Sequence, residues 1–62
     1  MNYRIGSIIE YKTFDGSFRK VLITDKLDDI KNGRSGFDGV LINDQDFTVW
    51  GYDYQVTRVV VR

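Results

Sequence analysis

The chain has 62 residues, of which 42% are hydrophobic and 15% aromatic, and its nine basic residues balance nine acidic ones. A chain of this length forms one domain, residues 1–62, with a small core and no room for a deep catalytic cleft. Cysteine and histidine are absent, which excludes disulfides, thiolate or imidazole metal sites and the common nucleophile–histidine pairs. We therefore expect a folded protein that is not an enzyme and has no cofactor.

The first predicted element is a long β-hairpin built from two alternating segments around an Asp-Gly pair at 15–16. A two-residue loop would oppose Lys12 to Arg19, and like charges opposite each other destabilise a strand pair. A three-residue loop with Gly16 in the left-handed conformation instead opposes Glu10 to Lys20. The sequence predicts this second register, which groups four residues as core: Ile9, Tyr11, Val21 and Ile23.

After the first hairpin, the sequence predicts one short helical turn. A residue at 24–25 is suited to cap its start, and Asn32-Gly33 is suited to end it. Leu27 and Ile30 lie three positions apart and would share one face of the turn. A turn this short is marginal alone, so it would have to dock on the sheet.

A glycine-rich loop and a second hairpin are expected next. Residues 33–39 are predicted to form a loop anchored by Phe37, because their glycines permit tight backbone geometry. The apolar runs on either side of Asn43–Asp46 predict a tight hairpin in which Trp50 covers the bare Gly39. In this register four residues form a second core face: Val40, Ile42, Phe47 and Val49.

The last elements are a 3₁₀ turn over Asp53–Gln55, "DYQ", and a closing strand, "VTRVVV". The order of long hairpin, long loop, tight hairpin, single turn and short strand resembles a small SH3-like barrel, and the resemblance covers most of the chain. It implies an all-β, five-stranded barrel with one helical turn in the long loop and a 3₁₀ turn before the last strand. The alternative fold is an open antiparallel sheet of three to five strands with one helical turn, completed by dimerisation.

The same architecture serves SH3 domains, Tudor domains, KOW modules and many small bacterial and phage proteins. "KNGRSGFDG" followed by "WGYDYQV" is also similar to a group of short prokaryotic and phage proteins, from which no function carries over. We expect a cytoplasmic protein, since no segment approaches the apolar length of a membrane span. A monomer and a homodimer both remain open, because uncovered strand edges invite pairing.

The leading functional hypothesis is a non-catalytic module that binds another, unidentified protein. Its candidate contact residues are Trp50, Tyr52, Phe37 and Arg34, because neighbouring exposed aromatics and arginine are common in binding surfaces. The alternative is that these aromatics only cover the sheet and loop, since aromatics in small folds are often structural. Tyr54 is expected to lie closer to the core.

The second hypothesis is nucleic-acid binding, in the manner of KOW or Tudor-like barrels. Its candidate residues are Lys12, Arg19, Lys20 and Arg58, with Phe18 between Lys12 and Lys20. The alternative is a solvated strand face in which Glu10 pairs with Lys20. The zero net charge favours that alternative, because nucleic-acid affinity comes largely from phosphate neutralisation.

Two acidic runs, at 28–29 and 44–46, raise the question of a metal site. An EF-hand needs acids at alternating positions and a bidentate glutamate at the end of its loop, and this chain contains only Glu10. Aspartate in turns and caps bonds to its own backbone. We expect turn and cap roles for these residues and no metal.

Overall fold

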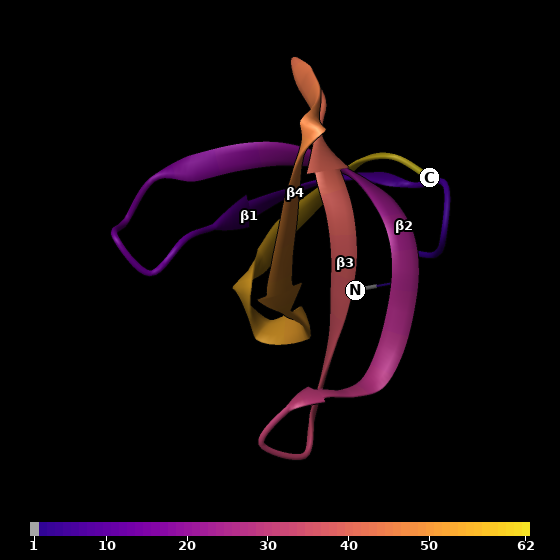
Figure 1. Ribbon diagram of the computed structural model, residues 1–62, viewed down its shortest axis with the longest axis vertical. Helices are drawn as coiled ribbons and strands as arrows, with labels where there is room; N and C mark the ends of the chain where they lie inside the picture. Colours follow the sequence, from indigo (N-terminus) through magenta and orange to yellow (C-terminus); the bar gives the residue numbers. More distant parts are fainter. Residues whose placement is uncertain (1) are drawn as a thin grey trace.

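The computed structural model describes residues 2–62, which form one strongly curved antiparallel β-sheet (Figure 1). Five strands and one 3₁₀ turn follow each other along the chain: β1 (Ile8–Lys12), β2 (Phe18–Lys31), β3 (Arg34–Leu41), β4 (Asp44–Tyr52), η1 (Asp53–Gln55) and β5 (Val56–Val61). The longest strand, β2, bends through its middle, so its two halves run in different directions. This bend gives the sheet a concave side, on which the core lies.

The strand order across the sheet is β4-β3-β2-β1-β5. The first four strands are neighbours in chain order, and the last strand returns to pair with β1. Strands β4 and β5 are the two edges, and within residues 2–62 they do not pair with each other. The all-β prediction of five strands is confirmed, and the sheet is open rather than closed by hydrogen bonds.

The first hairpin has the predicted register. Glu10 lies opposite Lys20, and Tyr11 lies opposite Arg19. The three-residue loop is closed by the Thr13 amide, which donates to the Ser17 carbonyl at 2.8 Å. Gly16 has a φ of 91°, a conformation that glycine adopts without a Cβ clash.

The core lies on the concave side of the sheet. The four predicted core residues of the first hairpin are at most 5% exposed, which confirms that part of the prediction: Ile9, Tyr11, Val21 and Ile23. Phe37 from β3 is fully buried and meets the ring of Tyr11 edge-on at 5.3 Å between centroids. The Tyr3 ring also meets Phe37 edge-on, at 6.0 Å between centroids.

The predicted helical turn is wrong, because β2 continues as a strand to Lys31. Asn32 and Gly33 both have positive φ values, 58° and 73°. These values, with Lys31 opposite Arg34, define a two-residue hairpin turn whose twist matches the flanking strands, for which Asn-Gly is the preferred pair. Asp29, for which a turn or cap role was expected, accepts a hydrogen bond from the Gly33 amide at 2.9 Å.

The predicted loop at 33–39 is also wrong, because these residues belong to β3, and the register against β4 differs by one residue from the prediction. Gly39 lies opposite Val49, and Phe37 lies opposite Gly51. A Cβ at Gly51 would lie 2.7 Å from the Phe37 ring, so Gly51 leaves the space that the ring fills. Burial of the Phe37 ring is favourable, and it sets this register.

The one-residue shift exchanges the two faces of β3, so Leu41 is buried in place of Val40. Ile42 and Phe47 are 36% and 54% exposed, and their assignment to the core is wrong. Val40 is half-buried on the convex face, and Val49 packs against the core. Trp50 lies opposite Asp38, not over Gly39.

The 3₁₀ turn η1 and the final strand β5 form where the sequence predicts them. Buried Gln55 fixes this junction, because its side-chain amide donates to the Lys12 carbonyl at 3.0 Å and its carbonyl accepts from the Tyr52 amide at 2.9 Å. Across residues 2–62, η1 is the only helical element, and no helix has the length and apolar character needed to cross a membrane.

Candidate protein-binding surface

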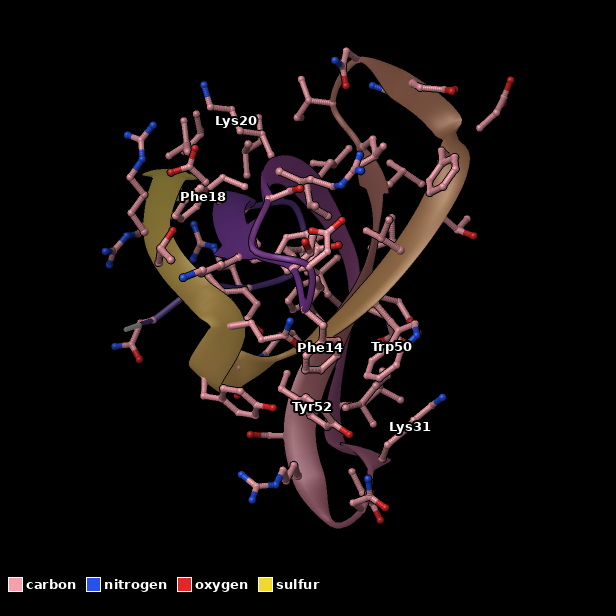
Figure 2. The ribbon with its side chains drawn as sticks, turned by 90° about the vertical axis from the view of Figure 1, so that its left-hand side faces the viewer. Phe14, Phe18, Lys20, Lys31, Trp50 and Tyr52 are labelled. Atoms are coloured by element: carbon pink, nitrogen blue, oxygen red, sulfur yellow. The ribbon has the colours of Figure 1, made fainter. Side chains whose placement is uncertain are left out.

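Four aromatic rings from three separate segments come together, and Figure 2 labels three of them, Phe14, Trp50 and Tyr52. Phe14 comes from the β1–β2 loop, Trp50 and Tyr52 from the end of β4, and Tyr54 from η1. The Tyr52 ring stacks on Tyr54 at 5.2 Å and meets Trp50 and Phe14 edge-on at 5.4 and 6.3 Å. We call these four residues the aromatic surface.

Tyr52 is the centre of the aromatic surface and is only 7% exposed. Its backbone amide is held by Gln55, and its phenol oxygen accepts a hydrogen bond from Asn32 Nδ2 at 3.2 Å. Because Gln55 also bonds to Lys12 in β1, three parts of the chain position this one ring. Tyr52 is therefore a rigid floor on which the other rings rest.

The outer rings of the aromatic surface are open to solvent. Phe14 is 72% exposed and Tyr54 63% exposed, while Trp50 is half-buried. A shallow groove of about 310 Å³ runs between the Phe14 loop and η1, with Lys12 and Thr57 along its sides. Large exposed rings on a fixed floor offer apolar area with little side-chain entropy left to lose on binding.

Two cations flank the aromatic surface, one on either side of the Asn32-Gly33 turn. Lys31 Nζ lies 4.4 Å from the Trp50 ring centroid, and the Arg34 guanidinium carbon lies 5.5 Å from the Tyr54 centroid. Cation–π contacts of this kind contribute roughly 0.5–1 kcal/mol at exposed sites. They also place positive charge at the rim of the apolar rings.

A polar cluster next to η1 ties the N-terminal segment to the aromatic surface. Asp53 accepts hydrogen bonds from the Tyr3 hydroxyl, from Lys26 Nζ at 2.9 Å and from Ser35 Oγ at 2.7 Å. Burial acts to raise the pKa of Asp53, but these hydrogen bonds outweigh it and the pKa is lowered. Burial, together with the bond to Asp53, raises the pKa of the Tyr3 hydroxyl. Asp53 is thus ionised at neutral pH and holds η1 in place.

The structure brings together three of the four residues predicted to bind a protein: Trp50, Tyr52 and Arg34. Phe37 is the exception, because it is 0% exposed and forms the centre of the core. Tyr54 was expected near the core, yet it is largely exposed on η1.

Phe14 and Lys31 were not identified from the sequence as members of this surface. Phe14 sits at the first position of a three-residue loop, and an aromatic side chain at a loop tip has no core to enter. That position was a usable signal for Phe14. For Lys31 the only signal was the Asn-Gly turn, which brings β2 and β3 side by side.

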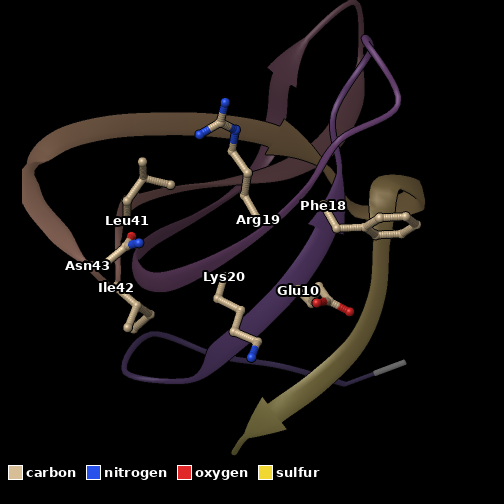
Figure 3. Close-up of a pocket in the computed structure, with 7 residues that line it drawn as sticks. All are labelled: Glu10, Phe18, Arg19, Lys20, Leu41, Ile42 and Asn43. Carbon is tan, nitrogen blue, oxygen red and sulfur yellow. The ribbon is translucent and has the colours of Figure 1, made fainter.

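The residues proposed for nucleic-acid binding do not form one continuous basic face. Figure 3 shows Lys20 pointing to one side of the hairpin and Arg19 to the other, as expected for adjacent strand residues. Glu10 lies beside Lys20 and forms an ion pair with Arg58 at 3.1 Å, so the predicted pairing of Glu10 with Lys20 is replaced by one with Arg58. An acid therefore lies in the middle of the remaining basic residues.

Comparison with protein-family models, with curated proteins and with solved structures finds no match. Within residues 2–62, no three acidic, histidine or cysteine side chains are grouped so that they could hold a metal ion. Functional inference for this chain therefore depends on the geometry of its own surface.

Proposed function

We propose that the protein is a non-catalytic module that binds a segment of another protein on the aromatic surface. The observation that carries the proposal is the convergence of four rings from three segments around the rigid Tyr52. Rings that served only the core would be buried, yet Phe14 and Tyr54 are mostly exposed. Exposed apolar groups gathered in one place are typical of interaction sites.

We further infer that the fold is of the SH3-like type. The strand order, the bend in β2 and the 3₁₀ turn directly before the last strand support this assignment. The segments that carry the aromatic surface are the β1–β2 loop, the end of β4 and the 3₁₀ turn. Fold alone does not define function, so the proposal depends on the rings.

The proposed partner segment inserts an apolar side chain into the groove between Phe14 and Tyr54. Lys31 and Arg34 at the rim favour a segment that also carries a carboxylate, because both cations retain solvent-facing hydrogen-bond donors. Tyr52 supports the other three rings and does not itself contact the partner segment. Binding energy in such a surface is concentrated in few aromatic residues.

The test is affinity capture from host lysate with a matched pair of variants. Tyr54→Ala removes an exposed ring of the aromatic surface, and Phe47→Ala removes a ring of similar exposure from β4, outside that surface. We expect the Tyr54 variant to lose the captured protein and the Phe47 variant to retain it. Circular dichroism of each variant checks that the fold is intact.

The proposal predicts that Phe14→Ala and Trp50→Ala lose the same protein as Tyr54→Ala. Recovery of an identical set of proteins by all of these folded variants would rule out the aromatic surface as the binding site. Loss of the captured protein only in the Phe47→Ala variant would instead place the binding site at the exposed edge of β4.

A further inference from the structure

The convex face of the sheet carries an apolar row that the aromatic surface does not include. Ile8 lies opposite Leu22, and Leu22 lies opposite Val40, so three aliphatic side chains on β1, β2 and β3 stand side by side. Val61 on β5 extends the row beyond Ile8 and is 52% exposed. The other three are half-buried.

Charges of opposite sign lie on the two sides of this apolar row. Lys20 is two residues from Leu22 along β2, on one side of the row. Asp38 is two residues from Val40 along β3, on the other side of the row, because the two strands are antiparallel. Both are therefore on the convex face, at equal distances from the row of about 7 Å. Figure 3 shows Lys20 on that face together with Ile42.

The acidic side of the row has no cation to neutralise it. Asp25 lies directly opposite Asp38 on the neighbouring strand, and like charges at such positions repel. Within residues 2–62, neither acid forms an ion pair, and Lys20 forms none either. The molecule thus leaves an unpaired cation and an unpaired acidic pair on either side of an apolar row.

We propose that this convex face binds a second copy of the same chain, with a two-fold axis parallel to the apolar row. Rotation about that axis sets the row of one copy on the row of the other and sets Lys20 over the acidic pair of its partner. The contact occurs twice, as in any isologous interface. A two-fold axis parallel to the strands would instead leave the acidic pair without a cation.

A second copy fits this face better than an unrelated partner does. The surface is complementary to itself in both apolar pattern and charge, which is the requirement for an isologous contact. The chain has a formal net charge of zero, so two copies do not repel each other as whole molecules, and a net charge near zero promotes association. The proposed contact does not use the four rings of the aromatic surface, although Trp50 lies opposite Asp38 on this face, and its readout is self-association rather than binding of another protein.

The experiment is sedimentation velocity of the full chain over a concentration series that reaches the millimolar range. We expect a monomer–dimer equilibrium for the natural sequence. Lys20→Glu places like charges together twice, and so does replacement of both acids by Asp25→Lys with Asp38→Lys, so each of these two charge reversals should weaken the dimer by at least about tenfold. The variant that combines all three substitutions restores opposite charges and should return the dissociation constant to within about threefold of the natural value.

Two controls make the charge exchange specific. Arg19→Glu changes the same net charge on the neighbouring residue, which points away from the convex face, and should leave the dimer unchanged. Val40→Lys introduces a charge into the apolar row and should abolish the dimer while the monomer stays folded, because Val40 is outside the core.

Three results would overturn the proposal. The first is a monomer at every concentration. The second is a dimer that both charge reversals leave intact, as a dimer formed through the exposed edge of β4 or β5 would be. The third is a combined variant that dimerises no better than the two charge reversals alone.

Discussion

The hairpin β1–β2 and the ribbon β3–β4 are built from similar residues, but different forces set their registers. In the first hairpin, the avoidance of like charges opposite each other and a loop glycine select one alignment locally, with Glu10 opposite Lys20. In the second, the alignment depends on Phe37, which enters a core supplied mostly by the other hairpin and requires Gly51 opposite it. Local chemistry therefore predicts the first register, and only packing across the molecule decides the second.

The strongest test of this comparison replaces two phenylalanines by alanine, one in the core and one at an exposed site. Phe37→Ala removes a fully buried ring from the core, and such a change costs about 3–5 kcal/mol of unfolding free energy. A domain of this size has roughly 3–9 kcal/mol in total, so this variant should be largely unfolded by circular dichroism. Phe47→Ala, at an exposed site, should change stability by less than about 0.5 kcal/mol. Equal effects would contradict the observed register.

The second test fills the space that a glycine leaves between β2 and β3. A Cβ at Gly39 would lie 2.5 Å from the Leu22 carbonyl oxygen and would also collide with the Val21 side chain. Gly39→Ala should therefore destabilise the protein by about 2–3 kcal/mol in urea unfolding, because backbone must move to admit the methyl group. A neutral result would show that β3 does not approach β2 this closely.

The third test compares the two hairpin turns. Gly16 and Gly33 both have positive φ and open space around them, so alanine at either position meets strain and no clash. Each substitution should cost about 1–2 kcal/mol, the penalty for a left-handed L-residue. Gly33→Ala should also reduce binding to the aromatic surface, because the turn positions Lys31 and Asn32. If Gly16→Ala destabilises the protein and Gly33→Ala does not, Gly33 does not have the positive φ of the Asn-Gly turn described above.

The smallest expected effect concerns the Asp53 cluster and its pH dependence. The pKa of Asp53 is lowered by Lys26, Tyr3 and Ser35 against the opposing effect of burial. A lowered pKa contributes stability above the unfolded value near 4, and that stability is lost as the pH falls through the folded pKa. Asp53→Asn should cost about 1 kcal/mol at pH 7, since the cluster is partly exposed and water screens it.

Urea unfolding between about pH 2 and pH 7 measures this effect. The Asp53→Asn variant should lose less stability on acidification than the natural protein does. Some dependence should remain from Asp15 in the first hairpin, where bonds from the Thr13 hydroxyl and the Ser17 amide lower the pKa to about 2. An unchanged pH profile in the variant would show that Asp53 is not held by its three donors.

The candidate binding surface was predicted in part. Trp50, Tyr52 and Arg34 were chosen because aromatics and arginine concentrated near the end of the chain, and the fold does bring them together. The loop-tip position of Phe14 indicated that its ring is exposed, but it did not indicate the contact with Tyr52, because the two residues are far apart along the chain and meet only in the folded sheet. Phe37 was misplaced because its glycine-rich surroundings resemble a loop.

The sequence by itself determined that the chain folds as a small all-β domain, and it determined the first hairpin, the 3₁₀ turn and the closing strand. Each of these follows from alternation, turn residues or charge pairing between near neighbours. The tertiary structure alone decided that Asn32-Gly33 is a hairpin turn, that Phe37 is core, and that Phe47 is exposed. The physical reason is that these outcomes depend on which ring fills the space left by glycines on a distant strand, and that competition is settled by burial over the whole molecule.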